Sequence, residues 1–399
     1  DIPSDADVSK LYLELNGGSF LISNCIFPSA ANASFQSITG TGSTPPGGRA
    51  IIRDCFFGST RGYQDVIDFT GGNRPGPLLQ VYHNVFTGSD DDVLDIDGTD
   101  AWIEGNIFMH VHRAGSPDSA SAVSGGDDSG QTSEITIVGN LFFDVDQAVT
   151  AKQGNFFTFL NNTVVDQNSR GSEERREDIV GQPDVFLPAV VNFADHGSAG
   201  ARGMYVEGNV IHSAEKLVRN YTGAEQVTFN NNLFPAGLSW SGPGSGNMSA
   251  PALLNDVIVE AATGVSNIPT PTKDNYRWVA QKIRQQFGLS TRSPARGVGP
   301  NGTDLGGIRP PGVSLGGTPT GTTNATTATL TVGTLLVGSG IPAGDAQFPN
   351  GSGWTHYRWR LDSTAWSAEA PIATPISLSG LANGPHTLEV VGKNDAGTY

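Results

Sequence analysis

Short hydrophobic runs recur along the first 234 residues, and each ends in a polar residue that is followed by another apolar pair. Eight such units occur, in segments such as WIEGNIF and YVEGNVI, and most follow one another at intervals of 22 to 34 residues. Their polar markers are Asn24, Asp54, Asn84, Asn106, Asn140, Asn162, Asn209 and Asn232. A period of this length indicates a solenoid in which one such residue per coil stacks at a bend. The pattern therefore predicts a parallel β-helix with an Asn ladder over residues 11–234.

Between these units lie strands in which every second residue is apolar. Because side chains alternate between the two faces of a strand, the apolar residues point inward and the residues between them point outward. The inward column is predicted to hold Ile67, Leu94, Val123, Val149, Val191 and Val218. The outward columns are predicted to hold Asp68, Asp95, Ser124, Thr150, Asn192 and Arg219, and beside them Thr70, Asp97, Gly126, Lys152 and Ala194. One face of the solenoid is thus expected to carry most of the polar chemistry.

The coil pattern stops after Phe234. Residues 274–287 then predict one amphipathic helix. Its Trp278, Ile283 and Phe287 are expected to cover the last coil and so to cap the solenoid.

A Gly-, Thr- and Pro-rich stretch over residues 313–327 predicts a linker. The alternating residues of 328–399 predict a small β-sandwich of the fibronectin or immunoglobulin type. The predicted fold class is all-β, with a right-handed parallel β-helix and its capping helix over residues 1–312, followed by the sandwich domain. We expect the β-helix to be a single-stranded solenoid.

Acidic residues outnumber basic ones by 39 to 23, and the net charge is −16. This balance argues against nucleic acid as a partner, and without an apolar stretch of roughly 18 residues we expect no membrane insertion. The richness in Asn, Thr, Gly and Ser is typical of secreted or cell-surface proteins, and we expect a monomer cut from a longer multidomain chain. Two cysteines are too few for a disulfide scaffold. Cys25 and Cys55 are expected in the core, either bonded or, as we favour, as thiols.

Six aspartates crowd onto two adjacent coils of the predicted solenoid, namely Asp65, Asp68, Asp91, Asp92, Asp95 and Asp97. Coils stack about 4.8 Å apart, so carboxylates this close repel one another unless one is protonated or a cation lies between them. Oxygen ligands without His or Cys favour a hard cation such as Ca²⁺. A bound calcium ion, a hydrolytic carboxylate pair and surface charge without a role all remain open at this stage.

The Asn ladder, the coil length and the Asp-Asp-x-x-Asp pattern of Asp91, Asp92 and Asp95 resemble right-handed parallel β-helix proteins, notably pectate lyases and related polysaccharide lyases. In the calcium-dependent lyases of the ninth polysaccharide-lyase family, an Asp on one coil and such a pattern on the next hold the metal. The resemblance implies a calcium site at Asp68, Asp91, Asp92 and Asp95, with a Lys as base. Val93 stands where that family usually has Gly, and its D-G-F-A-x-K segment has no match. The sandwich resembles accessory modules of large secreted bacterial proteins, which implies export.

The first functional hypothesis is a polysaccharide as partner, cleaved by calcium-assisted elimination at a uronate. Calcium would neutralise the uronate carboxylate while a base removes the adjacent proton. Lys152 is the preferred base, because it would project about 10 Å from Asp97 in the same column. Reserve candidates for base, acid or substrate binding are Arg113, His112 and Arg219, and further candidates for substrate contact are Asp65 and Asn192.

Two other functions would use the same face. In a glycoside hydrolase, one aspartate would donate a proton to the leaving oxygen while another activates water, and Asp95 and Asp97 are the candidates. In a non-catalytic cell-surface stalk or adhesin, the aspartates would bind calcium for stability alone.

Overall fold

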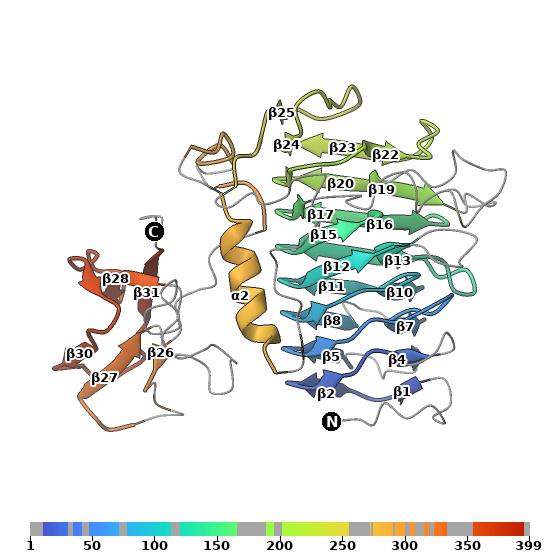
Figure 1. Ribbon diagram of the computed structural model, residues 1–399. Helices are drawn as coiled ribbons and strands as arrows, with labels where there is room; N and C mark the ends of the chain where they lie inside the picture. The colour runs from blue at the N-terminus through green and yellow to red at the C-terminus, as the bar shows by residue number, and fades with distance from the viewer. Residues whose placement is uncertain are drawn as a thin grey trace.

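The computed structural model describes residues 11–30, 35–41, 48–71, 78–112, 120–165, 189–194, 202–254, 272, 274–289, 292–299, 304–307, 315–317, 319, 323–332 and 354–394. Within these residues, three all-parallel sheets, here named A, B and C, stack the strands of successive coils (Figure 1). Each coil supplies one strand to each sheet in turn. The chain therefore forms a parallel β-helix, as the repeat predicts.

Sheet A contains β1 (Leu11–Asn16), β4 (Gln36–Thr41), β7 (Ile67–Thr70), β10 (Leu94–Asp97), β13 (Ser121–Gly125), β16 (Gln147–Lys152), β19 (Ala189–Ala194) and β22 (Lys216–Arg219). Sheet B contains β2 (Phe20–Ser23), β5 (Ala50–Arg53), β8 (Leu79–Tyr82), β11 (Ala101–Glu104), β14 (Glu134–Val138), β17 (Phe156–Leu160), β20 (Gly203–Glu207) and β23 (Gln226–Asn230). Sheet C contains β3 (Ile26–Phe27), β6 (Phe56–Phe57), β9 (Val85–Phe86), β12 (Ile107–Val111), β15 (Leu141–Val145), β18 (Thr163–Val165), β21 (Val210–Ile211), β24 (Leu233–Phe234) and β25 (Met248–Ser249).

The interior of the solenoid is filled by columns of identical or similar apolar side chains. The rings of Phe57 and Phe86 stack at 4.7 Å between centroids, and those of Phe86 and Phe108 stack at 5.1 Å. Such repetition buries each side chain against its counterpart in the neighbouring coils, which is how a solenoid obtains a continuous core.

An asparagine ladder runs along the bend between sheets B and C. The ladder residues Asn84, Asn106, Asn140, Asn162, Asn209 and Asn232 all bond in the same way. Each donates its backbone N–H and its Nδ2 to the Oδ1 of the ladder residue one coil later, at 2.7 to 3.2 Å. The prediction that Asn106, Asn140 and Asn162 stack in one column is confirmed. These buried amides satisfy one another, so the bend needs no solvent.

The predicted ladder is wrong by one residue in the first two coils. Cys25 and Cys55, rather than Asn24 and Asp54, occupy the column: Cys55 N donates to Asn84 Oδ1 at 2.9 Å, and Cys25 N donates to Cys55 Sγ at 3.3 Å. Asn24 and Asp54 lie one position earlier with left-handed φ angles of 57° and 55°. Asn and Asp tolerate this conformation and are therefore common at such bends. This is why the sequence pattern took Asn24 and Asp54 for ladder residues. Both cysteines are free thiols, as favoured.

The coil pattern also continues past Phe234, contrary to the prediction. Asn247 receives the hydrogen bonds of Asn232, and β25 pairs with β24 in parallel. A shortened final turn thus ends the described part of the solenoid. Its spacing of 15 residues from Asn232 to Asn247 falls below the period of the other coils, so the repeat was not visible.

The predicted helix is present as α2 (Tyr276–Gln286), but it does not cap the last coil. It lies along the outer face of sheet C, across several coils (Figure 1). At one end the Tyr276 ring contacts Phe56 at 5.4 Å, and at the other Phe287 stacks on Phe143 at 5.2 Å. Sheet C presents apolar residues outward as well as inward, and Val279, Ile283 and Phe287 cover them. The side chain of Trp278 lies outside the described residues.

Two small antiparallel sheets follow towards the C-terminus. One contains β26 (Leu315–Gly316), β27 (Thr327–Val332) and β30 (Ile376–Ser379), and the other contains β28 (Trp354–Leu361), β29 (Ala370–Pro371) and β31 (Leu388–Asn394). Their buried core contains Leu330, Val332, Tyr357, Ile372 and Ile376, which supports the predicted β-sandwich. Strand β26 pairs with β27 although it falls in the predicted linker, so the sheet begins earlier than expected. Within the described residues, helices are too short or too polar to cross a membrane.

Candidate functional site

The outward columns of sheet A have the predicted register. Asp95 lies opposite Asp68 on one neighbouring strand and opposite Ser124 on the other. Lys152 ends β16 opposite Ala194, and Asp97 ends β10 opposite Thr70, as predicted for the second outward column. The alternation of apolar and polar residues therefore brings the predicted chemistry to one face.

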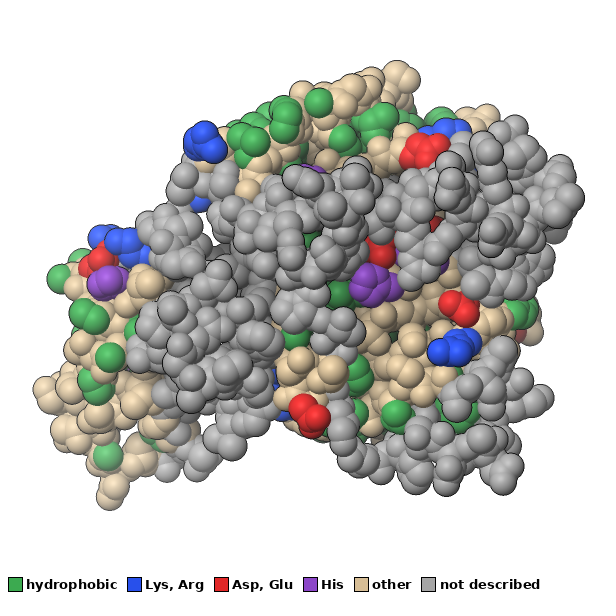
Figure 2. Space-filling view, viewed as in Figure 1, with side chains coloured by type: hydrophobic (Ala, Val, Ile, Leu, Met, Phe, Trp, Pro, Cys, Tyr) green, Lys and Arg blue, Asp and Glu red, His purple; other side chains and the backbone are tan. Residues whose placement is uncertain are grey.

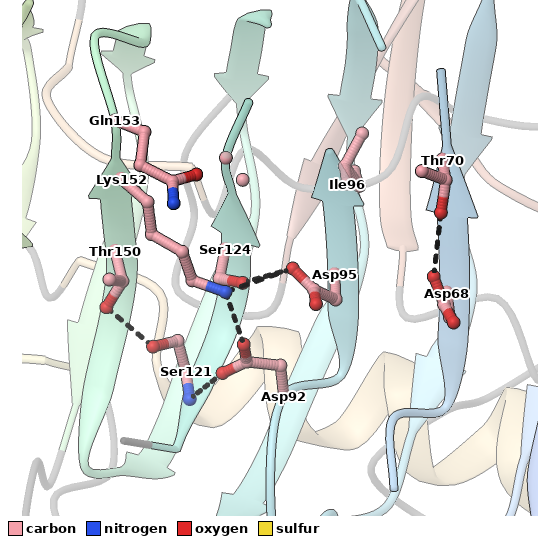
Figure 3. Close-up of polar contacts among 12 residues, drawn as sticks. Asp68, Thr70, Asp92, Asp95, Ile96, Ser121, Ser124, Thr150, Lys152 and Gln153 are labelled. Carbon is pink, nitrogen blue, oxygen red and sulfur yellow. Dashed lines mark hydrogen bonds and ion pairs between the residues drawn. The ribbon is translucent and has the colours of Figure 1, made fainter. Parts of the chain in front are cut away.

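Asp92, Asp95 and Lys152 form the centre of this face (Figure 3). The Lys152 side chain reaches back along the sheet, and its Nζ lies 3.3 Å from Asp95 Oδ1 and 3.8 Å from Asp92 Oδ2. Ser124 Oγ donates to Asp95 Oδ1 at 2.7 Å, and the backbone N–H of Ser121 donates to Asp92 Oδ1 at 2.7 Å. The carboxylates are thus held by three successive coils. We call Asp65, Asp92, Asp95, Asp97 and Lys152 the acidic cluster.

Burial changes the acid–base behaviour of these carboxyl groups. Burial raises the pKa of Asp92 to about 6, although the nearby Lys152 opposes the shift. Burial, together with the charge of Asp95, raises the pKa of Asp97 to about 6. The pKa of Asp65 is also well above its ordinary value, first because of burial and then because of the surrounding aspartates. The cluster can therefore hold protons near neutral pH.

Lys152 lies in its predicted column, but its side chain makes contacts that the sequence did not predict. Its amine contacts Asp95 and Asp92 directly, which leaves no room for a sugar unit between Lys152 and these two carboxylates. Burial alone would lower its pKa, but Asp95, Asp92 and Asp97 raise the pKa above the ordinary value of a lysine. In this arrangement the amine is a cation that balances the acids rather than a base.

The carboxylates that come together differ in part from the predicted metal ligands. Oxygen atoms of Asp65, Asp92 and Asp95 all lie within 4.8 Å of one another. Asp68 is not in this group, because it accepts hydrogen bonds from Gln36 at 3.3 Å and from Thr70 at 3.4 Å. Asp91 is buried in the turn before β10 and is not in the group either. Asp65, expected to contact substrate, joins the acids instead.

The acidic cluster fits a hard cation. Its donors are carboxylate oxygens alone, which Ca²⁺ prefers. In addition, Asp97 Oδ1 is buried and lacks a hydrogen-bond partner among the described residues. Lys152 balances only one of the four carboxylates of the acidic cluster, and a bound divalent cation would balance two more.

The remaining predicted residues have other surroundings. Asn192 belongs to a buried network in which its Nδ2 donates to Gln147 Oε1 at 3.1 Å, and Gln147 also accepts from Thr150 at 2.6 Å. Arg219 is buried at the end of β22, beyond Asn192 in the same column. Arg113 lies outside the described residues.

His112 is buried against two carboxylates that sequence reasoning missed. Its Nδ1 lies 3.0 Å from Asp146 Oδ1, and its Nε2 lies 3.0 Å from Asp144 Oδ2. Burial alone would lower its pKa, but the contacts with Asp144 and Asp146 raise the pKa to about 9. A signal was present in the sequence, since His112 and Asp146 are 34 residues apart, as are the ladder residues Asn106 and Asn140.

Comparison of the chain with protein-family models, with curated proteins and with solved structures finds no match.

Proposed function

We propose that the chain binds and cleaves a polysaccharide at the acidic cluster, and that carboxyl groups perform the acid–base chemistry. One observation carries this proposal: on the face where Lys152 contacts Asp92 and Asp95, two aspartates, Asp92 and Asp97, have pKa values raised to about 6. General acids need a pKa close to the working pH, so that they are protonated before the reaction and can give the proton up.

The contacts of the cluster suggest separate roles. Asp95 accepts hydrogen bonds from Ser124 and Lys152, which hold its carboxyl group in place for the role of the group that activates water. Asp92 or Asp97 would donate a proton to the leaving oxygen of the glycosidic bond. Separate acid and base carboxyls are the requirement of glycoside hydrolysis. Lys152, held as a cation beside Asp95, would attract an acidic sugar.

A second candidate is the calcium-assisted elimination that the resemblance to pectate lyases implies. The observation in its favour is the approach of Asp65, Asp92 and Asp95 within 4.8 Å, a donor set that would hold the metal. Bound calcium would supply positive charge that neutralises a uronate carboxylate and acidifies the adjacent C–H. Lys152 would then need to lose its proton before it could act as the base.

Product analysis separates these candidates. The purified chain is incubated with a panel of neutral and uronate polysaccharides, with calcium or with chelator. Hydrolysis predicts new reducing ends without ultraviolet absorbance from unsaturated sugars, in both conditions. Elimination predicts that absorbance only with uronate polymers and only with calcium.

Matched variants then test the residues. Asp92→Asn and Asp95→Asn are expected to lower the cleavage rate by at least about 100-fold, the usual contribution of a general acid or base. Asp127→Asn is the control, because this partly exposed residue lies in a turn outside the acidic cluster. A wild type that cleaves none of the polymers would reject both enzymatic candidates and leave a binding or structural role on a secreted or cell-surface protein.

A further inference from the structure

A second group of side chains lies where sheet C ends, at the corner that leads into sheet A. His110 and His112 come from β12 and the residue after it, and Asp144 and Asp146 come from the equivalent positions one coil later. The pairing of Met109 with Phe143 and of Val111 with Val145 fixes this register. His110 therefore lies against Asp144 of the next coil, and His112 lies against Asp146.

Three of these side chains converge on one point. His110 Nδ1 lies 2.6 Å from Asp144 Oδ2, and His112 Nε2 lies 3.0 Å from the same oxygen. One ligand atom from each of His110, His112 and Asp144 lies within 4.8 Å of the other two. Histidine and acidic side chains also reach the surface side by side on the face shown in Figure 2. Two imidazoles and one carboxylate are a donor set that suits zinc and other divalent transition metals.

One ring nitrogen of His112 points into this group. His112 is 9% exposed, and its Nε2 lies 3.0 Å from Asp144 Oδ2 in an ion-pair contact. Among the described residues, no hydrogen bond of good geometry reaches this buried nitrogen. When the ring is neutral, the Nε2 lone pair is available to a metal ion that the Asp144 carboxylate also contacts.

We propose that His110, His112 and Asp144 bind a divalent transition-metal ion, with Asp146 as the residue that orients His112. In metal sites, a ligating histidine commonly presents its other ring nitrogen to a carboxylate, which fixes the ring and strengthens the ligand. Asp146 has this place, 3.0 Å from His112 Nδ1. Ligands around a tetrahedral zinc ion lie roughly 3.4 Å apart, so modest side-chain shifts suffice.

The backbone supports the same arrangement. His110 and Asp144 have left-handed φ angles of 52° and 55°, in the middle of otherwise extended strands. His and Asp tolerate this conformation better than most residues, and at these equivalent positions it sets the direction of both side chains. Three protein ligands leave a fourth position of a tetrahedral ion open for water or substrate.

Titration of the full chain with Co²⁺, followed by displacement with Zn²⁺, tests the proposal. We expect one ion per chain, a visible absorption band of a low-coordinate cobalt site, and loss of that band when zinc is added. His112→Gln, His110→Gln and Asp144→Asn should each abolish the band. Asp146→Asn should keep it and weaken the affinity 10- to 100-fold, as for other outer carboxylates.

Two controls make the result specific. His386→Gln removes the histidine of a surface His–Asp pair in the C-terminal domain, where Nδ1 lies 2.6 Å from Asp362, and it should leave the titration unchanged. Asp92→Asn and Asp95→Asn in the acidic cluster should also leave it unchanged, so failure here is distinct from failure of the proposed function. Far-UV circular dichroism confirms that each variant is folded, and His110→Gln, at a 28% exposed side chain, is the mildest of them. Absence of cobalt binding in the wild type, or binding that survives in folded His110→Gln, would overturn the proposal.

Discussion

At the scale of single residues, the acidic cluster stores unfavourable electrostatic energy. Asp97 illustrates the effect, because burial and Asp95 both favour its neutral form. Its pKa of about 6 in the folded chain exceeds the ordinary value of 3.8. Ionisation therefore destabilises the fold: the associated stability is present below the unfolded-state pKa and is lost as the pH rises through the folded-state value.

Asp97→Asn is expected to stabilise the chain at pH 8 by about 1–2 kcal/mol, because the amide copies the neutral acid and removes the charge. The gain should fade as the pH falls through 6 and should vanish only below about pH 3, where Asp97 is protonated in both the folded and the unfolded state. Chemical denaturation in chelator across this pH range measures the difference. Asp127→Asn is the control for the loss of one carboxyl group outside the acidic cluster, and it should not reproduce the gain of Asp97→Asn at pH 8. A gain that persists in full below about pH 3 would mean that the shape of the amide, not its charge, is responsible.

At the scale of strands and turns, the Asn ladder is the main device that couples one coil to the next. Asn140 accepts from Asn106 N and Nδ2 and donates to Ile103 O at 3.0 Å and to Asn162 Oδ1 at 3.1 Å. An alanine here leaves several buried groups without partners in two neighbouring coils. Each such group costs about 1–3 kcal/mol.

Asn140→Ala is therefore expected to lower the free energy of unfolding by about 2–4 kcal/mol. Asn161→Gly is a matched control at the position before the next ladder residue, Asn162, where a left-handed φ of 48° suits glycine. The control should stay within about 0.5 kcal/mol of the wild type. Guanidinium denaturation gives both values. Equal losses in the two variants would show that turn geometry, and not the ladder, holds the coils.

The alternation of apolar and polar residues within strands explains which parts of the fold the sequence could predict. Alternation with period two fixed the register of sheet A, because a shift of one residue would turn Ile67 or Leu94 out to solvent. At the bend before sheet C no alternation fixes the register. The local sequence therefore allows either Asn24 or Cys25 to occupy the ladder position. The position of α2 was also unpredictable, because sheet C is apolar on both faces and its short strands give no alternation.

The candidate site shows the same limit. The backbone columns of Asp95 and Lys152 were predicted correctly, but the direction of the long Lys152 side chain was not. That direction depends on the attraction of buried carboxylates across three coils, which no local pattern contains. Asp144 and Asp146 were missed because the repeat was read from the Asn residues alone and was not extended to the His-x-His and Asp-x-Asp positions that share its spacing.

At the scale of the whole molecule, the four hydrophobic clusters of the described residues fall into two groups: three belong to the β-helix and α2, and one belongs to the C-terminal sheets. The β-helix core, with the layer beneath α2, shares no residue with the core of the C-terminal sheets. Units that do not share a core unfold independently unless an interface couples them. Thermal unfolding followed by calorimetry is therefore expected to show two transitions.

One pair of substitutions assigns these transitions. Ile283 in α2 and Ile376 in β30 are both fully buried, in different cores. Ile283→Ala and Ile376→Ala should each cost about 2–5 kcal/mol, because each leaves a cavity where a large side chain was packed. Ile283→Ala should lower only the transition of the β-helix, and Ile376→Ala only that of the C-terminal domain, where a small unit shifts by about 4–8 °C per kcal/mol. Each variant is the control for the other. A single transition that moves in both variants would show that the two units unfold as one, and contacts between them would then have to contribute several kcal/mol to the stability of the chain.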